Sequence, residues 1–286
     1  MAVCEVCFRH CDIKEGNTGF CMARGNVNGL IKPLNYGRVT SLALDPIEKK
    51  PLNRFYPGKK ILSVGSYGCN LRCPFCQNHE ISWGKEVKNW PEYARKMTPG
   101  ELVSEALSYK KYGNIGIAFT YNEPLVGYEF IRDTAKLVHD EGMVNVVVSN
   151  GTASLTVLNE LAPYIDAMNI DLKGFNADKY NSFLGGDLEM TTNFIRVAAG
   201  LFHVELTTLI VPGFNDSEEE MKKLSSWIAS ITDETGRVRG EDIPLHISRF
   251  FPSFKLDDAQ PTDVELIYHL KDIASENLKY VYTGNC

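Results

Sequence analysis

The chain from residue 60 onward alternates short apolar runs with longer segments in which apolar positions recur at helical spacing. Such an alternation of strand-length and helix-length patterns predicts a parallel sheet whose strands are joined by right-handed helical crossovers. The expected strands cover Ile61–Val64, Ile115–Phe119, Asn145–Ser149, Ala167–Ile170, Val204–Val211, Leu245–Ile247 and Tyr280–Tyr282. The pattern therefore indicates six or seven β/α units.

Capping sequences mark where the intervening helices begin. Thr98-Pro99-Gly100-Glu101 offers a capping hydroxyl, a proline at the first helical position and a glutamate that can reach back to the cap. The other helices are expected over Leu125–Glu141, around Leu155–Leu161, between Ala177 and Ala199 with an interruption at Gly185-Gly186, after Asp216-Ser217-Glu218-Glu219, and after Pro261-Thr262-Asp263.

We interpret residues 60–286 as a partial, open barrel of the (β/α)6 TIM type, because a complete eight-unit barrel typically needs about 250 residues. In such a barrel the active site lies at the carboxyl ends of the strands. Residues 1–59 form a small N-terminal extension in this prediction. Residues 1–29 are rich in cysteine and glycine without periodicity, and residues 30–59 suggest short strands and turns.

Composition and charge are those of an α/β globular protein that does not bind nucleic acid. Hydrophobic residues make up 44% of the 286 residues and charged residues 23%, with a formal net charge of −6. No stripe of Lys and Arg supplies the clustered cations that nucleic-acid binding requires. The longest apolar runs fall far short of a membrane span, and the N-terminus lacks the apolar stretch of a secretory signal. We therefore expect a cytoplasmic protein without a nucleic-acid or membrane partner.

The eight cysteines fall into two groups and one single residue, Cys286, to which the sequence assigns no role. In a cytoplasmic chain such grouping indicates metal ligation rather than disulfides. Cys69, Cys73 and Cys76 follow the first expected strand at C-x3-C-x2-C spacing. Three thiolates would leave one iron of a [4Fe–4S] cluster without a protein ligand, because such clusters ordinarily take four cysteines. A zinc site completed by a distant ligand such as His79, or buried free thiols, are the alternatives.

The other group stands at the N-terminus and consists of Cys4, Cys7, Cys11 and Cys21, spaced C-x2-C-x3-C-x9-C. Four thiolates close around a metal and leave no reactive position. Because this segment is too short for a hydrophobic core of its own, the metal would supply its folding energy. Zinc and an auxiliary [4Fe–4S] cluster both stay open as occupants, with zinc preferred.

The Cys69–Cys76 loop resembles the cluster motif of radical S-adenosylmethionine (SAM) enzymes. The resemblance implies a [4Fe–4S] cluster whose fourth iron is chelated by the amino and carboxylate groups of SAM. It also implies that the reduced cluster cleaves SAM to methionine and a 5′-deoxyadenosyl radical, which removes a hydrogen atom from a substrate. A reductant such as ferredoxin or flavodoxin would then be a partner, and the fold would be the partial barrel of radical SAM enzymes.

Two of the next strand ends are similar to SAM-binding segments of pyruvate formate-lyase activating enzymes. Glu123, in the sequence TYNEP, matches the glutamate that holds the SAM amino group, and its alternative role is to complement a helix dipole. Ser149 and Asn150 resemble a segment near the ribose and methionine of SAM, although Asn-Gly is also a common turn signal. The resemblance thus assigns these three residues to the cofactor.

Three later strand ends carry the same resemblance. Asp171 and Lys173 match an aspartate–leucine–lysine motif in which the lysine would pair with the SAM carboxylate, with an exposed ion pair as the alternative. Val211 matches a valine–proline–glycine motif that lines the adenine. His246 would contact the SAM ribose by the same analogy, although a lone histidine at a strand end is more often structural.

Departures from the activating enzymes concern the substrate side. Tyr121-Asn122 replaces a glycine pair, Val148 replaces an aspartate, and Thr207 or a neighbour replaces an arginine. The last two changes favour a small organic or partner-delivered substrate over a glycine in a protein, the substrate of a glycyl-radical-enzyme activase. The hypothesis from another class is a non-enzymatic iron–sulfur electron carrier or a zinc scaffold.

The resemblance extends over nearly the whole chain. The Cys4–Cys21 block and the segments TSLALDPIEKKPL, SYGCNLRCPFCQN, IDLKGF, LIVPGFND and LHISRFFPSF resemble the radical SAM enzymes of the AmmeMemoRadiSam system, which are relatives of pyruvate formate-lyase activating enzyme. This resemblance makes Memo-type and AMMECR-type proteins candidate partners. The substrate itself is not indicated: Tyr121, Arg249, Phe250 and Phe251 could line its pocket or belong to the core.

Overall fold

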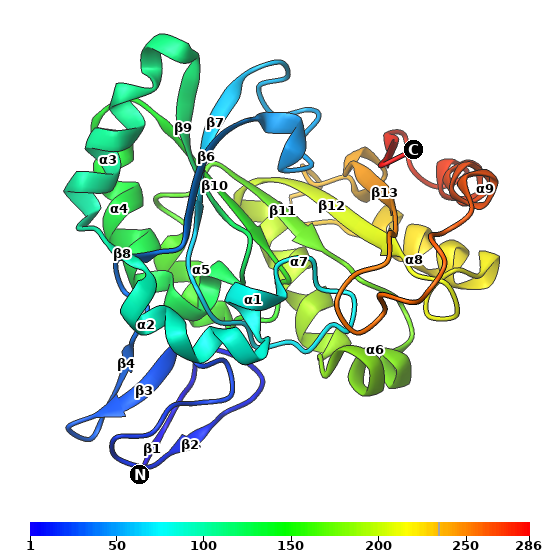
Figure 1. Ribbon diagram of the computed structural model, residues 1–286. Coiled ribbons are helices and arrows are strands. Elements are labelled where there is room, and N and C mark those ends of the chain that lie inside the picture. The colour runs from blue at the N-terminus through cyan, green and yellow to red at the C-terminus, as the bar shows by residue number, and fades with distance from the viewer. Residues whose placement is uncertain (234) are drawn as a thin grey trace.

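The computed structural model describes residues 1–233 and 235–286, and its centre is a sheet of eight strands (Figure 1). In spatial order the strands are β14 (Val281–Gly284), β13 (Leu245–Arg249), β12 (His203–Ile210), β11 (Ala167–Asp171), β10 (Val144–Ser149), β9 (Asn114–Thr120), β7 (Lys60–Gly65) and β6 (Ser41–Pro46). Strand β6 is antiparallel to β7, and all the other pairs are parallel. Because β14 and β6 are the two edges, the curved sheet stays open, as a partial barrel does.

Each predicted strand is present, and neighbours in the sequence are neighbours in the sheet. For example, Val146 of β10 is in register with Ala167 of β11 and with Ala118 of β9. The central strands are almost wholly buried because helices cover one face and the barrel interior lies on the other. The prediction of a parallel α/β sheet with an open barrel is therefore confirmed.

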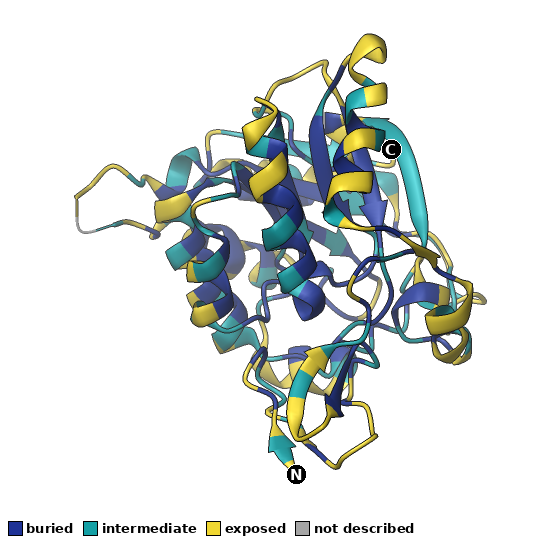
Figure 2. Cartoon of the chain, turned by 90° about the vertical axis from the view of Figure 1, so that its left-hand side faces the viewer, coloured by how far each residue is buried: buried dark blue, intermediate teal, exposed yellow. Residues whose placement is uncertain are grey.

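The helices pack along the outer face of the sheet and bury one side each, as Figure 2 shows by the dark inner and yellow outer surfaces. The longer helices are α3 (Pro99–Ser108), α4 (Tyr128–Asp140), α5 (Leu155–Leu161), α6 (Ala177–Leu184), α7 (Leu188–Leu201), α8 (Glu218–Ala229) and α9 (Val264–Ser275). The short helices α1 (His79–Ser82) and α2 (Trp90–Tyr93) follow the cysteine loop.

The predicted helix boundaries have the expected local causes. Thr98 and Glu101 form a reciprocal capping box, with the Thr98 amide donating to the Glu101 carboxylate at 2.7 Å. The side chains of Ser217 and Asp263 cap α8 and α9 by accepting from the backbone amides of Glu220 and Glu265. Gly185 ends α6 with a left-handed φ of +62°, a conformation that suits glycine, and thereby causes the predicted interruption.

Residues 41–46 join the central sheet as β6, so the sheet begins before the domain start expected at residue 60. The segment after β6 closes one end of the barrel, where Ile47 and Leu52 are fully buried against Ile61, Ala118 and Val146. A capping helix-and-loop segment thus shields the apolar barrel interior from water at the end opposite the cysteine loop.

The rest of the extension forms small antiparallel pairs at the end of the sheet where the cysteine loop follows β7 (Figure 1). Its strands are β1 (Ala2–Val3), β2 (Asp12–Ile13), β3 (Arg24–Val27) and β4 (Leu30–Pro33), and β5 (Arg38–Val39) pairs with β8 (Arg95–Lys96). A buried ion pair of 2.8 Å between Arg24 and Glu129 ties the extension to α4. In the described residues, no helix combines the length and apolar character needed to cross a membrane.

Candidate active site

A cavity of about 930 Å³ opens at the carboxyl ends of the parallel strands. Its wall is formed by the loops that follow β7, β9, β10 and β11 and by interior side chains of β12 and β13. This is the end of the barrel at which active sites are expected. A volume of this size accommodates a ligand as large as a nucleoside with a side chain, together with a second small molecule.

Cys69, Cys73 and Cys76 all line this cavity and come from one loop. All three are free thiols, and burial raises the pKa of each of them, that of Cys73 to about 12. A buried thiol of this kind stays protonated in the absence of metal and releases its proton when a metal ion binds to the sulfur. Three thiols on one short loop are a donor set that suits an iron–sulfur cluster, because soft thiolates select such clusters.

In residues 1–233 and 235–286, no group of three or more His, Cys, Asp or Glu side chains stands at the spacing that a bound metal ion would require, and this holds for both groups of cysteines. His79, the fourth ligand in the zinc alternative, stacks on Phe254 with ring centroids 4.2 Å apart and is not part of the cavity wall. The three thiols thus line the cavity, whereas the histidine of the zinc alternative does not.

Glu123 is buried in the cavity wall, where its carboxylate accepts hydrogen bonds from Ser149 Oγ at 2.8 Å and from the Asn150 amide at 2.8 Å. Burial raises the pKa of Glu123 to about 7, and the hydrogen bonds partly offset this effect. The carboxylate also accepts from the Leu125 amide at 3.0 Å. It thus caps the short helical turn after β9, which is the alternative role that the sequence suggested, and it lines the cavity as well.

Asn150 lies between Glu123 and the cysteine loop. Its side-chain nitrogen Nδ2 donates to Asn70 Oδ1 at 2.9 Å and lies 3.9 Å from the sulfur of Cys69. Gly151, with a φ of +68°, makes the turn that the Asn-Gly pair predicts. Ser149 and Asn150 are therefore held rigidly beside the three thiols, and both line the cavity.

Asp171 and Lys173 also face the cavity and form an ion pair of 2.8 Å. Although burial opposes the charge of Lys173, the Asp171 carboxylate and the neighbouring Cys73 raise the pKa of Lys173. The lysine is therefore a fixed cation next to the cysteine loop. Strand residues two apart point to the same side of a sheet, which explains why both side chains reach the cavity.

His246 lines the cavity but is held from behind by Glu205, a residue that we did not single out in the sequence. His246 Nε2 lies 2.7 Å from Glu205 Oε2, and His203 Nε2 lies 2.9 Å from the other carboxylate oxygen. The backbone amides of Asn53 and Arg54 also donate to this fully buried carboxylate. Although burial opposes ionisation, these hydrogen bonds lower the pKa of Glu205 to about 2. The only sequence signal was one acidic residue inside the apolar run VELTTLIV.

Val211 does not line the cavity, so the structure does not support its expected contact with an adenine. Its side chain is buried in an apolar cluster with Leu71, Cys73 and Phe214. The side chain of Leu209, two residues earlier on β12, lines the cavity instead. The turn expected from Val-Pro-Gly is present, because the Phe214 amide donates to the Val211 carbonyl at 3.0 Å.

Of the four residues considered for a substrate pocket, only Tyr121 lines this cavity. Phe250 is buried in the core, whereas Phe251 is 41% exposed and lies within 4.8 Å of the Arg249 guanidinium. Tyr121 has a φ of +76°, a strained value for a tyrosine and an ordinary one for the glycine of the related motif.

Tyr121 belongs to a polar group that the sequence did not reveal. Its hydroxyl donates to Asp45 Oδ2 at 3.0 Å, and the same oxygen accepts from Lys50 Nζ at 3.0 Å and from Ser63 Oγ at 2.8 Å. Asp45, Lys50 and Tyr121 line the cavity. They come from β6 and the segment after it, whose position inside the barrel is visible only in the fold.

Comparison with known proteins shows similarity to radical SAM proteins and to pyruvate formate-lyase activating enzymes. The profile described as the radical SAM superfamily matches residues 63–225. An uncharacterized protein of Methanocaldococcus jannaschii is 44% identical over 284 residues, which are 99% of this chain and 80% of that protein. The pyruvate formate-lyase 1-activating enzyme of Escherichia coli is 25% identical over 226 residues, which are 73% of this chain and 86% of that enzyme. A domain of the pyruvate-formate lyase-activating enzyme from Bacteroides vulgatus superposes with a TM-score of 0.50 at 20% identity, covering 59% of this chain and 98% of that domain.

Proposed function

The chain belongs to the radical SAM superfamily, and from this premise we propose that it cleaves SAM reductively at a [4Fe–4S] cluster held by Cys69, Cys73 and Cys76. The cluster supplies the electron, and the resulting 5′-deoxyadenosyl radical abstracts hydrogen from a substrate. The observation that carries the proposal is that three thiols from one short loop line a cavity of about 930 Å³ at the carboxyl ends of the strands.

In this proposal the polar side chains around the three thiols bind the cofactor. The Glu123 carboxylate accepts from the amino group of SAM, and the Lys173 ammonium attracts the carboxylate, with Asp171 orienting the lysine. Ser149 and Asn150 border the methionine and ribose, and His246, oriented by Glu205, donates to or accepts from a ribose hydroxyl.

We propose that the substrate lies at the part of the wall formed by Asp45, Lys50 and Tyr121. These side chains combine a carboxylate, an ammonium and a hydroxyl, and so suit a small polar organic molecule or one delivered by a partner. Val148 and Thr207 line the same cavity without the aspartate and arginine of the activating enzymes. For this reason the proposal ranks activation of a protein glycine second, although activating enzymes are distant relatives.

The proposal includes a reductant such as ferredoxin or flavodoxin, because radical SAM enzymes need an electron for each cleavage. It also keeps the AmmeMemoRadiSam assignment, a cytoplasmic location, and Memo-type and AMMECR-type proteins as candidate partners. These finer assignments depend only on the sequence motifs given above.

The test is anaerobic reconstitution with iron and sulfide, followed by addition of dithionite and SAM and assay of 5′-deoxyadenosine. The proposal expects product from the full chain and from a Cys286→Ala control, since Cys286 is exposed and belongs to neither cysteine group. It expects none from Cys69→Ala. An electron carrier or zinc scaffold would give no product from any of the three proteins, and that result would overturn the proposal.

A further inference from the structure

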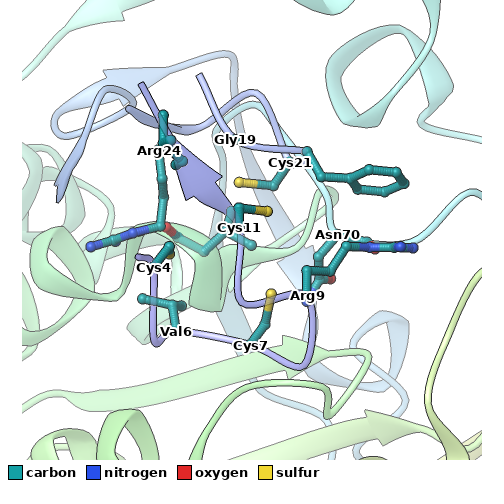
Figure 3. Close-up of a pocket in the computed structure, with 12 residues that line it drawn as sticks. Cys4, Val6, Cys7, Arg9, Cys11, Gly19, Cys21, Arg24 and Asn70 are labelled. Atoms are coloured by element: carbon teal, nitrogen blue, oxygen red, sulfur yellow. The ribbon is translucent and has the colours of Figure 1, made fainter. Parts of the chain in front are cut away.

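The four N-terminal cysteines gather around a cavity that is separate from the active site. Cys4, Cys7, Cys11 and Cys21 all line a space of about 10 Å³, and Figure 3 shows them with the side chains of Arg9 and Arg24 on either side. All four are free thiols, and three of them are buried. Four cysteines from a segment of 21 residues thus line one small cavity without forming a disulfide, and in the described residues a bound ion would have to draw their sulfurs closer together.

The segment that carries these cysteines has little else to hold it together. Its strands β1 and β2 have two residues each, and most of the side chains of residues 9–18 are exposed. A fold of this kind usually needs a cross-link or a metal to be stable. Four thiolates are a complete ligand set for a tetrahedral ion, with no position left for a substrate.

The size and charge of the site favour a single ion. A space of about 10 Å³ holds about one water-sized particle, which suits a single ion better than the eight atoms of a [4Fe–4S] core. Four thiolates and one divalent ion carry a net charge of about −2. Arg9 and Arg24 line the same cavity; because Arg24 is already paired with Glu129, Arg9 is the cation that can offset part of that charge.

The extension is packed directly against the backbone of the cysteine loop at the active site. Gly68, which precedes Cys69, has a φ of +94°, and a Cβ atom placed there would lie 2.6 Å from the carbonyl oxygen of Cys21. Arg9 Nε donates to the carbonyl of Asn70 at 3.0 Å, and its terminal nitrogen donates to the carbonyl of Gly185. The N-terminal site and the active-site loop therefore share one packed interface.

Asn70 links the two cysteine groups. It lines the N-terminal cavity together with Cys7. Its side chain accepts from Asn150 at 2.9 Å and donates to Thr152 at 2.8 Å. Contacts thus run from the N-terminal cysteines to Asn150 in the wall of the active site.

Phe20 provides a second link between the extension and the loop. Its ring lies between two guanidinium groups, 3.5 Å from that of Arg9 and 3.7 Å from that of Arg72. Arg72 in turn donates to the carbonyls of Cys69 and Leu71 at 2.9 and 2.7 Å. Both arginines therefore bind backbone carbonyls of the loop while they stack on Phe20, which is adjacent to Cys21.

We propose that Cys4, Cys7, Cys11 and Cys21 bind one thiophilic metal ion, namely zinc, and that this closed centre braces the loop carrying Cys69. The ion gives the extension its fold, and the folded extension holds Arg9, Phe20 and the Cys21 carbonyl against residues 68–72. The proposal does not require SAM cleavage, so the two hypotheses can fail separately.

The first experiment counts zinc and iron by mass spectrometry in the full chain and in variants. About one zinc ion per chain is expected in the full chain, in a Cys286→Ser control and in Cys69→Ser, which removes a thiol of the other group. The zinc should be absent from Cys4→Ser and Cys21→Ser. Four additional iron atoms lost from these variants, in place of zinc, would overturn the single-ion assignment, and absence of any metal would overturn the site.

The second experiment measures backbone hydrogen exchange over residues 66–73. Exchange is expected to be roughly tenfold faster in Cys4→Ser and in Arg9→Ala, because local opening becomes easier when the brace is lost. Arg95→Ala, which removes an exposed arginine elsewhere, should leave it unchanged. Removal of the zinc from the intact chain by a chelator, with the iron content checked, provides the same comparison if the variants do not fold. Unchanged exchange in all of these samples would overturn the bracing role.

Discussion

The two groups of cysteines in this chain differ in the space that they face. Four thiols surround about 10 Å³ in the N-terminal extension, whereas three thiols border about 930 Å³ at the mouth of the barrel. The first arrangement has a full ligand set and no room for another molecule. The second has an incomplete set and ample room. In our proposals, ligand number and free volume together separate a structural metal centre from a reactive one.

The charged side chains around the two groups of cysteines differ as well. The charged side chains that line the cavity of the four thiols are Arg9 and Arg24, both cationic, and Arg24 is paired with Glu129. Around the three thiols stand Glu123, Asp171 and Lys173, charges of both signs that face the cavity. A mixture of fixed charges suits a zwitterionic ligand such as the methionine part of SAM.

The largest effect is expected from Cys73→Ala. Loss of one of three thiolates should weaken iron binding at the active site by more than the roughly 100-fold that even an outer-sphere change can cost. The N-terminal zinc should stay in place. Iron and zinc counts after anaerobic reconstitution measure both quantities. Full iron retention by Cys73→Ala would remove the basis for the comparison.

A large effect on stability is expected from Glu205→Gln. The carboxylate is buried and binds His203, His246 and two backbone amides, so its replacement leaves buried donors with a weaker acceptor. The free energy of unfolding should fall by roughly 3 kcal/mol. Urea denaturation of the metal-free chain measures it, with exposed Glu276→Gln as a control that should stay within about 0.5 kcal/mol. A fall no larger than the control would show that the barrel interior does not depend on this network.

A pH dependence of SAM binding is expected from Glu123. Burial raises the pKa of this carboxyl to about 7, so the fraction that is ionised increases about tenfold between roughly pH 6 and pH 8. Because the ionised form accepts hydrogen bonds from an amino group better, the affinity for SAM should rise by about the same factor. Titration calorimetry without reductant measures it. If the SAM affinity of Glu123→Gln rose with pH to the same extent, the pH dependence would have to come from another group.

The smallest effect is expected from Tyr121→Phe, which removes one hydrogen bond to Asp45 from the part of the wall assigned to the substrate. The free energy of unfolding should fall by about 1 kcal/mol, the usual contribution of such a bond. Cleavage of SAM without substrate should be unaffected, since the hydroxyl is directed to Asp45 and not to the cysteine loop. A marked loss of 5′-deoxyadenosine would place Tyr121 with the cofactor instead.

The sequence predicted most of the fold because its signals are local. The strand at Ala167–Ile170 is a buried apolar run, and the capping box at Thr98 and Glu101 appears in the structure as expected. The cysteine loop was equally clear, since its spacing lies within eight residues. Apolar periodicity, capping and ligand spacing all act over distances that a short stretch of sequence contains.

The features that sequence analysis missed depend on contacts between distant segments. The importance of Glu205 becomes visible only in the folded chain, where its carboxylate binds His246 and the backbone amides of residues 53 and 54. The antiparallel edge strand β6 and the polar group at Asp45 arise because residues 41–50 fold back along β7. Val211 was assigned to the cavity from its motif, but its side chain turns into the apolar cluster below the cysteine loop.

The most direct test of the open site is electron–nuclear double resonance on the reduced protein with SAM labelled by nitrogen-15 at its amino group. If three thiolates leave one iron free for the cofactor, the electron spin of the cluster should couple to the labelled nitrogen, and Cys69→Ala should show neither cluster nor coupling. A reduced cluster that binds SAM without any coupling to this nitrogen would contradict the account.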